Sequence, residues 1–266
     1  MKKLLLFALA CCILPSMEAK LITKSVAYEH QGTRLEGYLA YDDARATAGQ
    51  TPGVLVIPEW WGLNAYVKSR ADQLAQLGYV AFVADMYGKG KVTEDPKQAE
   101  EWAGQFYGKS LMPERARAGL DQLLQNDGVD KSKVAAIGYC FGGSAAQTLA
   151  YSGAPLAGIV SFHGGPVAAP ESAQGKVKAK FLLLNGAIDP MVSPEDRAAL
   201  EQSLEKIGVD YQSIDYAHAI HAFTNPDADR VAQAHGMVGK IGYNEPAARR
   251  SWQQMQIFFD EIFRRK

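Results

Sequence analysis

The sequence predicts an α/β fold in a single domain, with a mainly parallel central sheet and helices on both faces. Three observations predict it. Short apolar runs of strand length recur along the chain, amphipathic segments with helix caps alternate with them, and no linker or internal repeat divides the chain. Such alternation builds βαβ units, whose strands are parallel and covered on both faces. With 266 residues, of which 47% are hydrophobic and 21% charged, the chain can bury a large core.

The first 19 residues have the pattern of a secretory signal rather than of a folded element. "MKK" is a positive start, eleven apolar residues follow, and "PSMEA" ends in a small residue. Eleven apolar residues are too few for a membrane-spanning helix, which needs about 20. We expect a signal peptide at 1–19, cleaved after Ala19 or alternatively after Ser16, and a folded domain at 20–266. A lipid anchor on a leader cysteine is the less favoured alternative. The expected location is secreted or periplasmic.

The mature chain is expected to begin with a β-hairpin. Residues 22–43 alternate between apolar and polar and turn at Gln31-Gly32. The apolar run at 53–58 is typical of a strand buried on both faces. A helix follows, in which Asn64 is the N-cap and Gly78 ends the last turn.

The rest of the chain repeats the strand and helix patterns. Ser193 and Pro194 open one helix as N-cap and first residue, and Trp252 and Phe259 lie on the apolar stripe of the last helix. The expected strands are 79–85, 133–138, 156–162, 179–186 and 210–216, and the expected helices are 95–108, 113–127, 142–151, 194–207 and 246–263. In open α/β sheets, reactive loops lie at the carboxyl ends of the strands, so the residues after each strand are the candidate site.

Cys140 follows the strand at 133–138 within "GYCFGG", a G-x-C-x-G pattern. Once the leader is removed, no second cysteine is left to form an internal disulfide. One interpretation is a small buried hydrophobe. The other is a nucleophile on a tight strand-to-helix turn, where flanking glycines relieve crowding and the helix N-terminus favours a thiolate. The strand before it and the helix after it favour the nucleophile.

An acid and a base follow later strands. Asp189, in "NGAIDP", is either a turn-forming residue or the acid that orients the base. His218 and His221 compete for the role of base, and His221, which an apolar residue follows, is favoured. The chain order nucleophile, acid, base is that of an α/β-hydrolase fold.

Other candidates stand after two further strands. Glu59 directly follows the strand at 53–58 and is either a surface residue or a site carboxylate near the thiol. The N–H groups of Trp60 and Phe141 occupy the positions expected of an oxyanion hole. Trp60 and Trp61 could equally be pocket walls or core aromatics. His163 lines the pocket or is a structural histidine.

Several classes of function are excluded. The net charge of −1 predicts no nucleic-acid partner, and no membrane partner is expected after signal removal. No HExxH pattern, thiolate zinc set, P-loop or G-x-G-x-x-G is present, so we expect neither metal nor cofactor. The expected partner is a small ester or lactone, and the expected state is a monomer.

The motifs resemble those of the dienelactone hydrolase family. They are "PEWWGLN", "ADMYGKG", "GYCFGG", "NGAIDP" and "HAIHAFTNP", in that order and spacing. The resemblance implies a carboxymethylenebutenolidase-like ester hydrolase without a cofactor. It implies a triad of Cys140, His221 and Asp189, with Glu59 helping to activate the thiol and the N–H groups of Trp60 and Phe141 forming the oxyanion hole.

The chain departs from the family at the substrate clamp. Where family members that act on dienelactone carry arginines, this sequence has Lys89 and Asn225. A lysine holds a carboxylate only as a point charge and an asparagine carries no charge, so dienelactone itself is not the expected substrate. Tyr87, Trp61 and His163 are the remaining candidates for substrate contact.

The sequence therefore predicts an exported thiol hydrolase of carboxylic esters or lactones that works through an acyl-enzyme. Two other functions are considered. A non-catalytic binding protein would keep the fold without turnover. A thiol redox protein is disfavoured, because no second cysteine could resolve a disulfide.

Overall fold

The computed structural model of the chain describes residues 20–46 and 49–264. The expected signal peptide at 1–19 lies outside the described residues. One sheet of eight strands is formed: β1 (Leu21–His30), β2 (Thr33–Asp42), β3 (Thr51–Ile57), β4 (Val80–Val83), β5 (Val129–Tyr139), β6 (Gly158–Phe162), β7 (Lys180–Gly186) and β8 (Tyr211–Tyr216). The α-helices are α1 (Ala65–Gln76), α2 (Pro96–Ala103), α3 (Leu111–Leu124), α4 (Phe141–Tyr151), α5 (Pro194–Ile207), α6 (Ala228–Ala234) and α7 (Glu245–Phe263).

The strand order across the sheet is β1-β2-β4-β3-β5-β6-β7-β8. The strands β1 and β2 pair antiparallel with each other, and β2 pairs antiparallel with β4, while all pairs from β4 to β8 are parallel. The hairpin turns at Gln31 and Gly32, both with positive φ (51° and 73°), as a tight two-residue turn requires. The predicted mainly parallel α/β fold is therefore confirmed.

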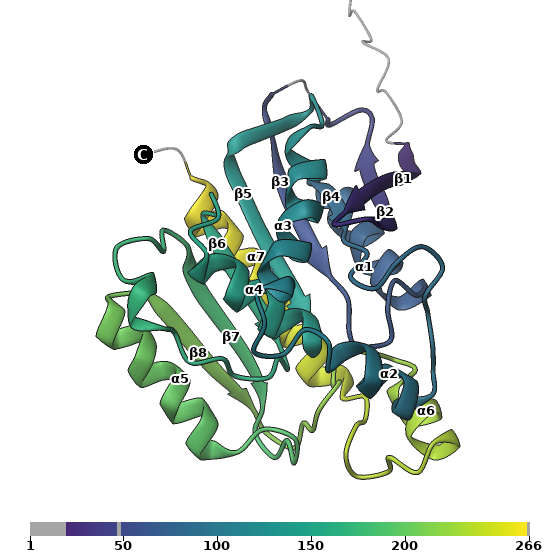
Figure 1. The fold of residues 1–266 in the computed structure, drawn as a ribbon, viewed down its shortest axis with the longest axis vertical. Helices are drawn as coiled ribbons and strands as arrows, with labels where there is room; N and C mark the ends of the chain where they lie inside the picture. The colour runs from purple at the N-terminus through teal and green to yellow at the C-terminus, as the bar shows by residue number, and fades with distance from the viewer. Residues whose placement is uncertain (1–19, 47–48, 265–266) are drawn as a thin grey trace, which may run out of the picture.

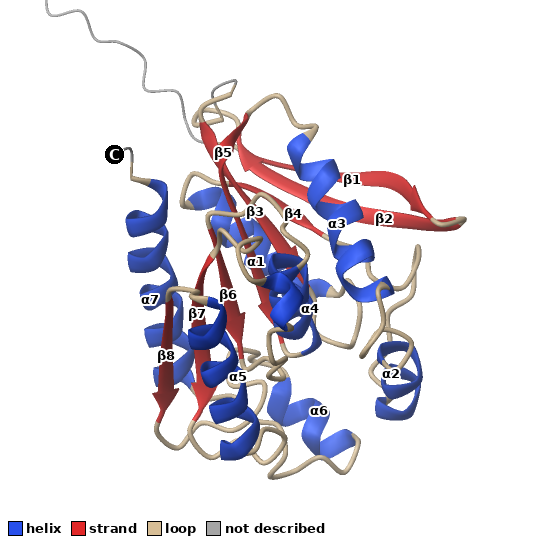
Figure 2. Ribbon diagram, turned by 60° about the vertical axis from the view of Figure 1, so that its left-hand side comes forward, coloured by secondary structure: helices blue, strands red, loops and turns tan. Residues whose placement is uncertain are grey.

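Helices cover both faces of the sheet, as Figures 1 and 2 show. On one face, buried residues of α3, α4 and α5 pack on the sheet in one apolar cluster, and on the other face α1 and α7 pack in a second cluster. The central strands are apolar on both sides: β4 and β6 are buried along their whole length. This double cover explains why they appear in the sequence as continuous apolar runs.

Three elements differ from the sequence interpretation. The helix expected at 95–108 ends at Ala103 as α2. The strand β5 begins at Val129 rather than 133, because Val129 and Asp130 pair with Thr51 and Pro52 before the apolar run. The short helix α6 was not predicted. Its seven residues are too few for a clear period, and its buried Val231 packs in a small cluster that includes Trp61. Within the described ranges, no helix is both long and apolar enough to cross a membrane.

The parallel strands β3, β5, β6, β7 and β8 end at the same edge of the sheet. The loops that follow them carry the candidate residues Glu59, Cys140, His163, Asp189 and His221. This topology brings together residues that are as much as 162 positions apart in the chain.

Candidate functional site

Cys140 lies at a sharp turn between β5 and α4, where it is the N-cap residue of the helix. Its φ of 52° and ψ of −116° are unusual for a residue with a side chain, and its N–H donates to the carbonyl of Phe162 at 3.0 Å. A Cβ atom at Gly138 would collide with the Gly142 carbonyl, and one at Gly142 would collide with the carbonyls of Ile57 and Pro58. The turn therefore requires both glycines, and it presents the partly exposed thiol at the helix N-terminus.

His221 and Asp189 form a buried pair next to this turn. The Nδ1 atom of His221 lies 2.8 Å from Oδ2 of Asp189, and both side chains are almost fully buried. Burial by itself lowers the pKa of His221, but the charge of Cys140 and the hydrogen bond with Asp189 outweigh it and raise the pKa to about 10. The imidazole therefore favours its charged form while a thiolate is beside it.

The other ring nitrogen of His221 faces the thiol. Cys140 raises the pKa of His221 both through its charge and through a weak hydrogen bond. Among the described residues, Nε2 of His221 has no hydrogen-bond partner within the usual distance and angle. Nε2 is thus left able to exchange a proton with Cys140 or with a bound substrate.

Glu59 is buried directly after β3, with only 2% of its surface exposed. Its Oε2 accepts a hydrogen bond of 2.8 Å from Nδ2 of Asn225. Burial raises the pKa of Glu59 to about 7, although this hydrogen bond and the charges of His221 and Arg70 oppose the shift. The interpretation of Glu59 as a surface residue is wrong, since the carboxyl group lies inside the site region.

The backbone at the two expected oxyanion positions has suitable geometry. Phe141 is the first residue of α4, and Trp60 follows Glu59 in a turn that the Gly62 N–H closes on the Glu59 carbonyl at 3.2 Å. Across residues 20–46 and 49–264, the N–H groups of Trp60 and Phe141 donate no backbone hydrogen bond. Free N–H groups at a helix N-terminus can receive a developing negative charge.

Aromatic side chains surround Phe141, next to the thiol. The rings of Tyr87, Phe106 and Tyr107 lie 5.7, 5.5 and 5.7 Å from that of Phe141. Burial and then the charge of Cys140 raise the pKa of both Tyr87 and Tyr107, so both phenols lie within electrostatic reach of the thiol. The buried Tyr87 hydroxyl has no hydrogen-bond partner among the described residues. Phe106 and Tyr107 were not singled out in the sequence, where they are two of many helix aromatics.

The two clamp positions pair with other residues of the protein. Lys89 is 63% exposed, and its Nζ pairs with Glu36 of β2 at 2.8 Å. Asn225 is buried; its Nδ2 donates to Glu59 at 2.8 Å and its Oδ1 accepts from the Asp227 N–H at 3.0 Å. Each end of an amide can form a second hydrogen bond, so both positions stay predicted substrate contacts.

Two further expected contacts belong to the packing. Trp61 is buried in the cluster beneath α6, which agrees with the interpretation as a core aromatic, and its role as a pocket wall stays a prediction. His163 is 1% exposed, and its Nε2 lies 2.7 Å from Oγ1 of Thr224. Of its two interpretations, the structural histidine is the one the structure supports. Thr224 carried no signal in the sequence, because a threonine before an asparagine in a loop is ordinary.

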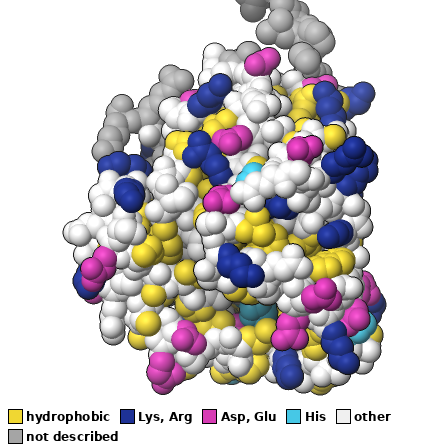
Figure 3. Space-filling view, viewed as in Figure 1, with side chains coloured by type: hydrophobic (Ala, Val, Ile, Leu, Met, Phe, Trp, Pro, Cys, Tyr) yellow, Lys and Arg dark blue, Asp and Glu magenta, His cyan; other side chains and the backbone are white. Residues whose placement is uncertain are grey.

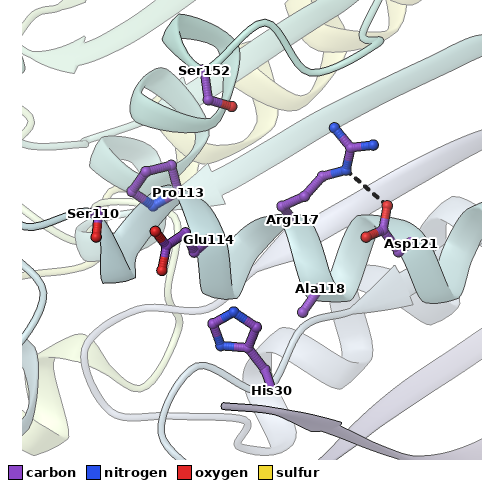
Figure 4. Close-up of a pocket in the computed structure, with 8 residues that line it drawn as sticks. All are labelled: His30, Ser110, Pro113, Glu114, Arg117, Ala118, Asp121 and Ser152. Carbon is purple, nitrogen blue, oxygen red and sulfur yellow. Dashed lines mark hydrogen bonds and ion pairs between the residues drawn. The ribbon is translucent and has the colours of Figure 1, made fainter.

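The surface in Figure 3 shows basic and acidic side chains interspersed on one face of the molecule. A groove of about 450 Å³ lies over α3, where Arg117 pairs with Asp121 and His30 faces the helix, but it contains none of the residues described above (Figure 4). Among the described residues, no group of three His, Cys, Asp or Glu side chains could hold a metal ion.

Known proteins resemble the chain over most of its length. The profile of the dienelactone hydrolase family matches residues 35–263. "Protein usf" of Aquifex pyrophilus is 27% identical and a candidate carboxymethylenebutenolidase of Synechocystis sp. is 28% identical, with 89% and 92% of this chain and 97% and 100% of those proteins covered.

Solved structures agree with these sequence matches. The dienelactone hydrolase-like promiscuous phosphotriesterase P91 from metagenomic libraries has a TM-score of 0.85 and 38% identity, covering 92% of this chain and 99% of that one. A candidate dienelactone hydrolase of Klebsiella pneumoniae has the same fold, with a TM-score of 0.73 at 21% identity, and covers 91% and 99% of the two chains. The chain therefore belongs to the dienelactone hydrolase family and is a hydrolase.

Proposed function

We propose that the protein is an exported cysteine hydrolase of uncharged carboxylic esters or lactones, working through an acyl-enzyme on Cys140. One observation carries this proposal. His221 binds the buried Asp189 through Nδ1 at 2.8 Å and turns its other nitrogen toward a thiol that a strained turn presents at a helix N-terminus. This arrangement of nucleophile, base and orienting acid is the one that acyl transfer needs.

In the proposed first half-reaction, Cys140 gives its proton to Nε2 of His221, and the thiolate sulfur attacks the carbonyl carbon. The carbonyl electron pair moves to oxygen, and the N–H groups of Trp60 and Phe141 stabilise that charge. As the oxyanion collapses, the bond to the leaving oxygen breaks, and that oxygen takes the proton from Nε2 of His221. The product is a thioester on Cys140 and a free alcohol, or the ring-opened hydroxyl group of a lactone.

In the second half-reaction, water replaces the alcohol. His221 takes a proton from the water, and the water oxygen attacks the thioester carbonyl. The thiolate of Cys140 then leaves as the acid forms. Asp189 fixes the imidazole tautomer and stabilises the imidazolium in both steps. Glu59 lies near the imidazole, and its ionised form would favour the charged pair of His221 and Cys140.

The preference for uncharged substrates follows from the side chains around the thiol. At the positions where the resemblance places arginines, Lys89 is committed to Glu36 and Asn225 to Glu59. The neighbours of Phe141 are aromatic instead, with Tyr87 as an uncharged hydrogen-bond donor. At these two positions a substrate carboxylate would meet a lysine that is already paired and an uncharged amide, whereas an apolar or aromatic ester would pack against the rings.

A panel of activated esters and lactones tests this function. Neutral aryl esters and anionic lactones would be compared on the wild-type protein, Cys140→Ala and Cys140→Ser. We expect the wild type to turn over the neutral esters best, the alanine variant to lose activity and the serine variant to retain a small fraction. Equal rates for wild type and Cys140→Ala would contradict the mechanism. A stable protein without activity on any member would favour the non-catalytic binding protein.

Neutral phosphotriesters are a second candidate substrate class at the same site. The observation that favours them is the 38% identity to a protein described as a promiscuous phosphotriesterase, together with the uncharged surroundings of Cys140. The same thiol would attack phosphorus and release an aryl alcohol. Burst release of one alcohol per Cys140, absent in Cys140→Ala, is the expected result with an aryl dialkyl phosphate.

Export is proposed from the leader pattern at 1–19. Expression of the full chain and of residues 20–266 in a bacterium tests it. The full chain should be found outside the cytoplasm with the mature mass, and the shortened chain should remain inside. Recovery of the full-length mass in the cytoplasm would contradict export.

A further inference from the structure

A buried chain of hydrogen bonds runs behind His221 and has no part in the steps above. Nε of Arg70 donates to the Tyr66 hydroxyl at 3.3 Å, that hydroxyl lies 2.7 Å from Oγ1 of Thr224, and Oγ1 lies 2.7 Å from Nε2 of His163. Arg70 also donates to the Thr224 carbonyl at 2.6 Å through Nη2. Thr224 and His163 are each 1% exposed. These groups come from α1, the end of β6 and the loop after β8, so the fold assembles them specifically.

The protons in this chain can run in two directions. A guanidinium can only donate, so the Tyr66 oxygen accepts from Arg70. If the Tyr66 proton goes to Oγ1 of Thr224, the threonine donates to Nε2 of His163, and the Nδ1–H of His163 is left without a partner among the described residues. If Nε2 of His163 donates to Thr224 instead, the partly buried Tyr66 hydroxyl has no acceptor for its proton within the chain. In both directions the Thr224 hydroxyl is bonded to Nε2 and orients the His163 ring.

The surroundings of His163 favour its neutral form. Burial, and then the charge of His221, hold the pKa of His163 well below its ordinary value. Its ring lies edge-to-face against that of His221, with centroids 5.2 Å apart, and a strained φ of 40° holds its backbone there. On the other side, its ring contacts Phe223 at 5.2 Å. His221 thus packs against a second imidazole whose charge and orientation a hydrogen-bond chain controls.

We propose that Thr224 is a positioning residue: its hydrogen bond to Nε2 of His163 orients that imidazole, which packs edge-to-face on His221 and so holds the ring of His221 in line between Asp189 and Cys140. The inference rests on the proposed function, in which His221 is the base. Without the Thr224 hydroxyl, no described side chain would hold Nε2 of His163, and the ring would be free to turn. A protonated His163 would repel the imidazolium that His221 forms during catalysis.

Thr224→Val and Thr224→Ser test this role, because valine keeps the shape and serine keeps the hydroxyl. We expect Thr224→Val to lower kcat about tenfold while KM changes less than about twofold, and Thr224→Ser to stay within about twofold of wild type. Nitrogen-15 NMR of the histidine side chains supplies the readout that packing alone would not move. We expect His163 to have the same single tautomer in the wild type and in Thr224→Ser, and a different or mixed state in Thr224→Val.

A matched pair of tyrosines keeps the test decisive if the valine variant does not fold. The rings of the partly buried Tyr66 and the buried Tyr139 pack together with centroids 5.5 Å apart, but the Tyr139 hydroxyl has no partner among the described residues. We expect Tyr66→Phe to perturb the His163 tautomer and lower kcat, and Tyr139→Phe to leave both unchanged.

Two results would overturn the inference: a Thr224→Val variant with wild-type tautomer and kcat, or equal effects of the two tyrosine substitutions. Failure of the proposed function is recognised separately. In that case the wild-type protein itself has no activity toward the ester panel, while the NMR experiment still reports the tautomer of His163.

Discussion

The wild-type protein is expected to lose stability as the pH rises, because Glu59 loses its proton. Replacing Glu59 by glutamine should abolish this dependence on pH. The carboxyl group is buried, and its hydrogen bond comes from the uncharged amide of Asn225. Because the pKa of Glu59 is raised, the folded protein holds the proton more tightly than the unfolded chain does. Protonation therefore favours the folded state, and this stability is lost as the pH rises through the folded value.

The expected magnitude follows from the two pKa values. Burial raises the pKa of Glu59 from 4.5 to about 7, and each pKa unit corresponds to about 1.4 kcal/mol. Linkage then gives a loss of about 2.5 kcal/mol in the free energy of unfolding between about pH 5 and pH 8. Glutamine has nearly the same shape and can still accept from Asn225, but it carries no titrating group. The Glu59→Gln variant should therefore lack this part of the pH dependence.

Urea unfolding followed by tryptophan fluorescence measures the effect. The free energy of unfolding would be determined at both pH values for the wild type and for Glu59→Gln, so that the difference between the two proteins subtracts every other titrating group. Glu245→Gln serves as a control, because Glu245 is exposed and lies on α7. If wild type and Glu59→Gln lose the same stability between the two pH values, Glu59 titrates normally and the reasoning is refuted.

Three further predictions concern the same site. Asp189→Asn should fold but lower kcat by roughly 10⁴-fold, because an amide does not stabilise the imidazolium of His221; a drop of less than tenfold, measured with a neutral ester, would contradict this. Tyr87→Phe should raise the free energy of unfolding by about 1 kcal/mol, because it removes a buried hydroxyl without a partner; a loss of stability in urea titrations would show that the hydroxyl is satisfied. Asn225→Arg should improve kcat/KM for anionic lactones more than for neutral ones, because it places a cation beside Glu59, and equal changes would remove the case for an uncharged clamp.

The fold and the candidate triad could be predicted because they depend on local patterns. Buried parallel strands appear as apolar runs, and the residue after each run lies at the carboxyl edge of the sheet, which is where Cys140, Asp189 and His221 stand. The glycines around Cys140 could also be understood from sequence, since the turn leaves no room for side chains.

The partners of individual side chains could not be predicted in the same way. Asn225 and Glu59 are 166 residues apart and Thr224 and His163 are 61 apart, and each contact depends on how loops from different strands pack. Lys89 was assigned to the substrate by motif alone, but its flexible side chain takes the nearest carboxylate, Glu36 on β2. The short helix α6 is stabilised by contacts with Trp61 and its neighbours rather than by its own seven residues.

The most direct test of a covalent mechanism at Cys140 is rapid-quench mass spectrometry of the protein during turnover of a slow neutral ester. The account predicts that the peptide containing Cys140 gains the mass of the acyl group within the first turnover, and that the adduct disappears as the acid is released. Product formation without any adduct on that peptide, or an adduct on another residue, would contradict it.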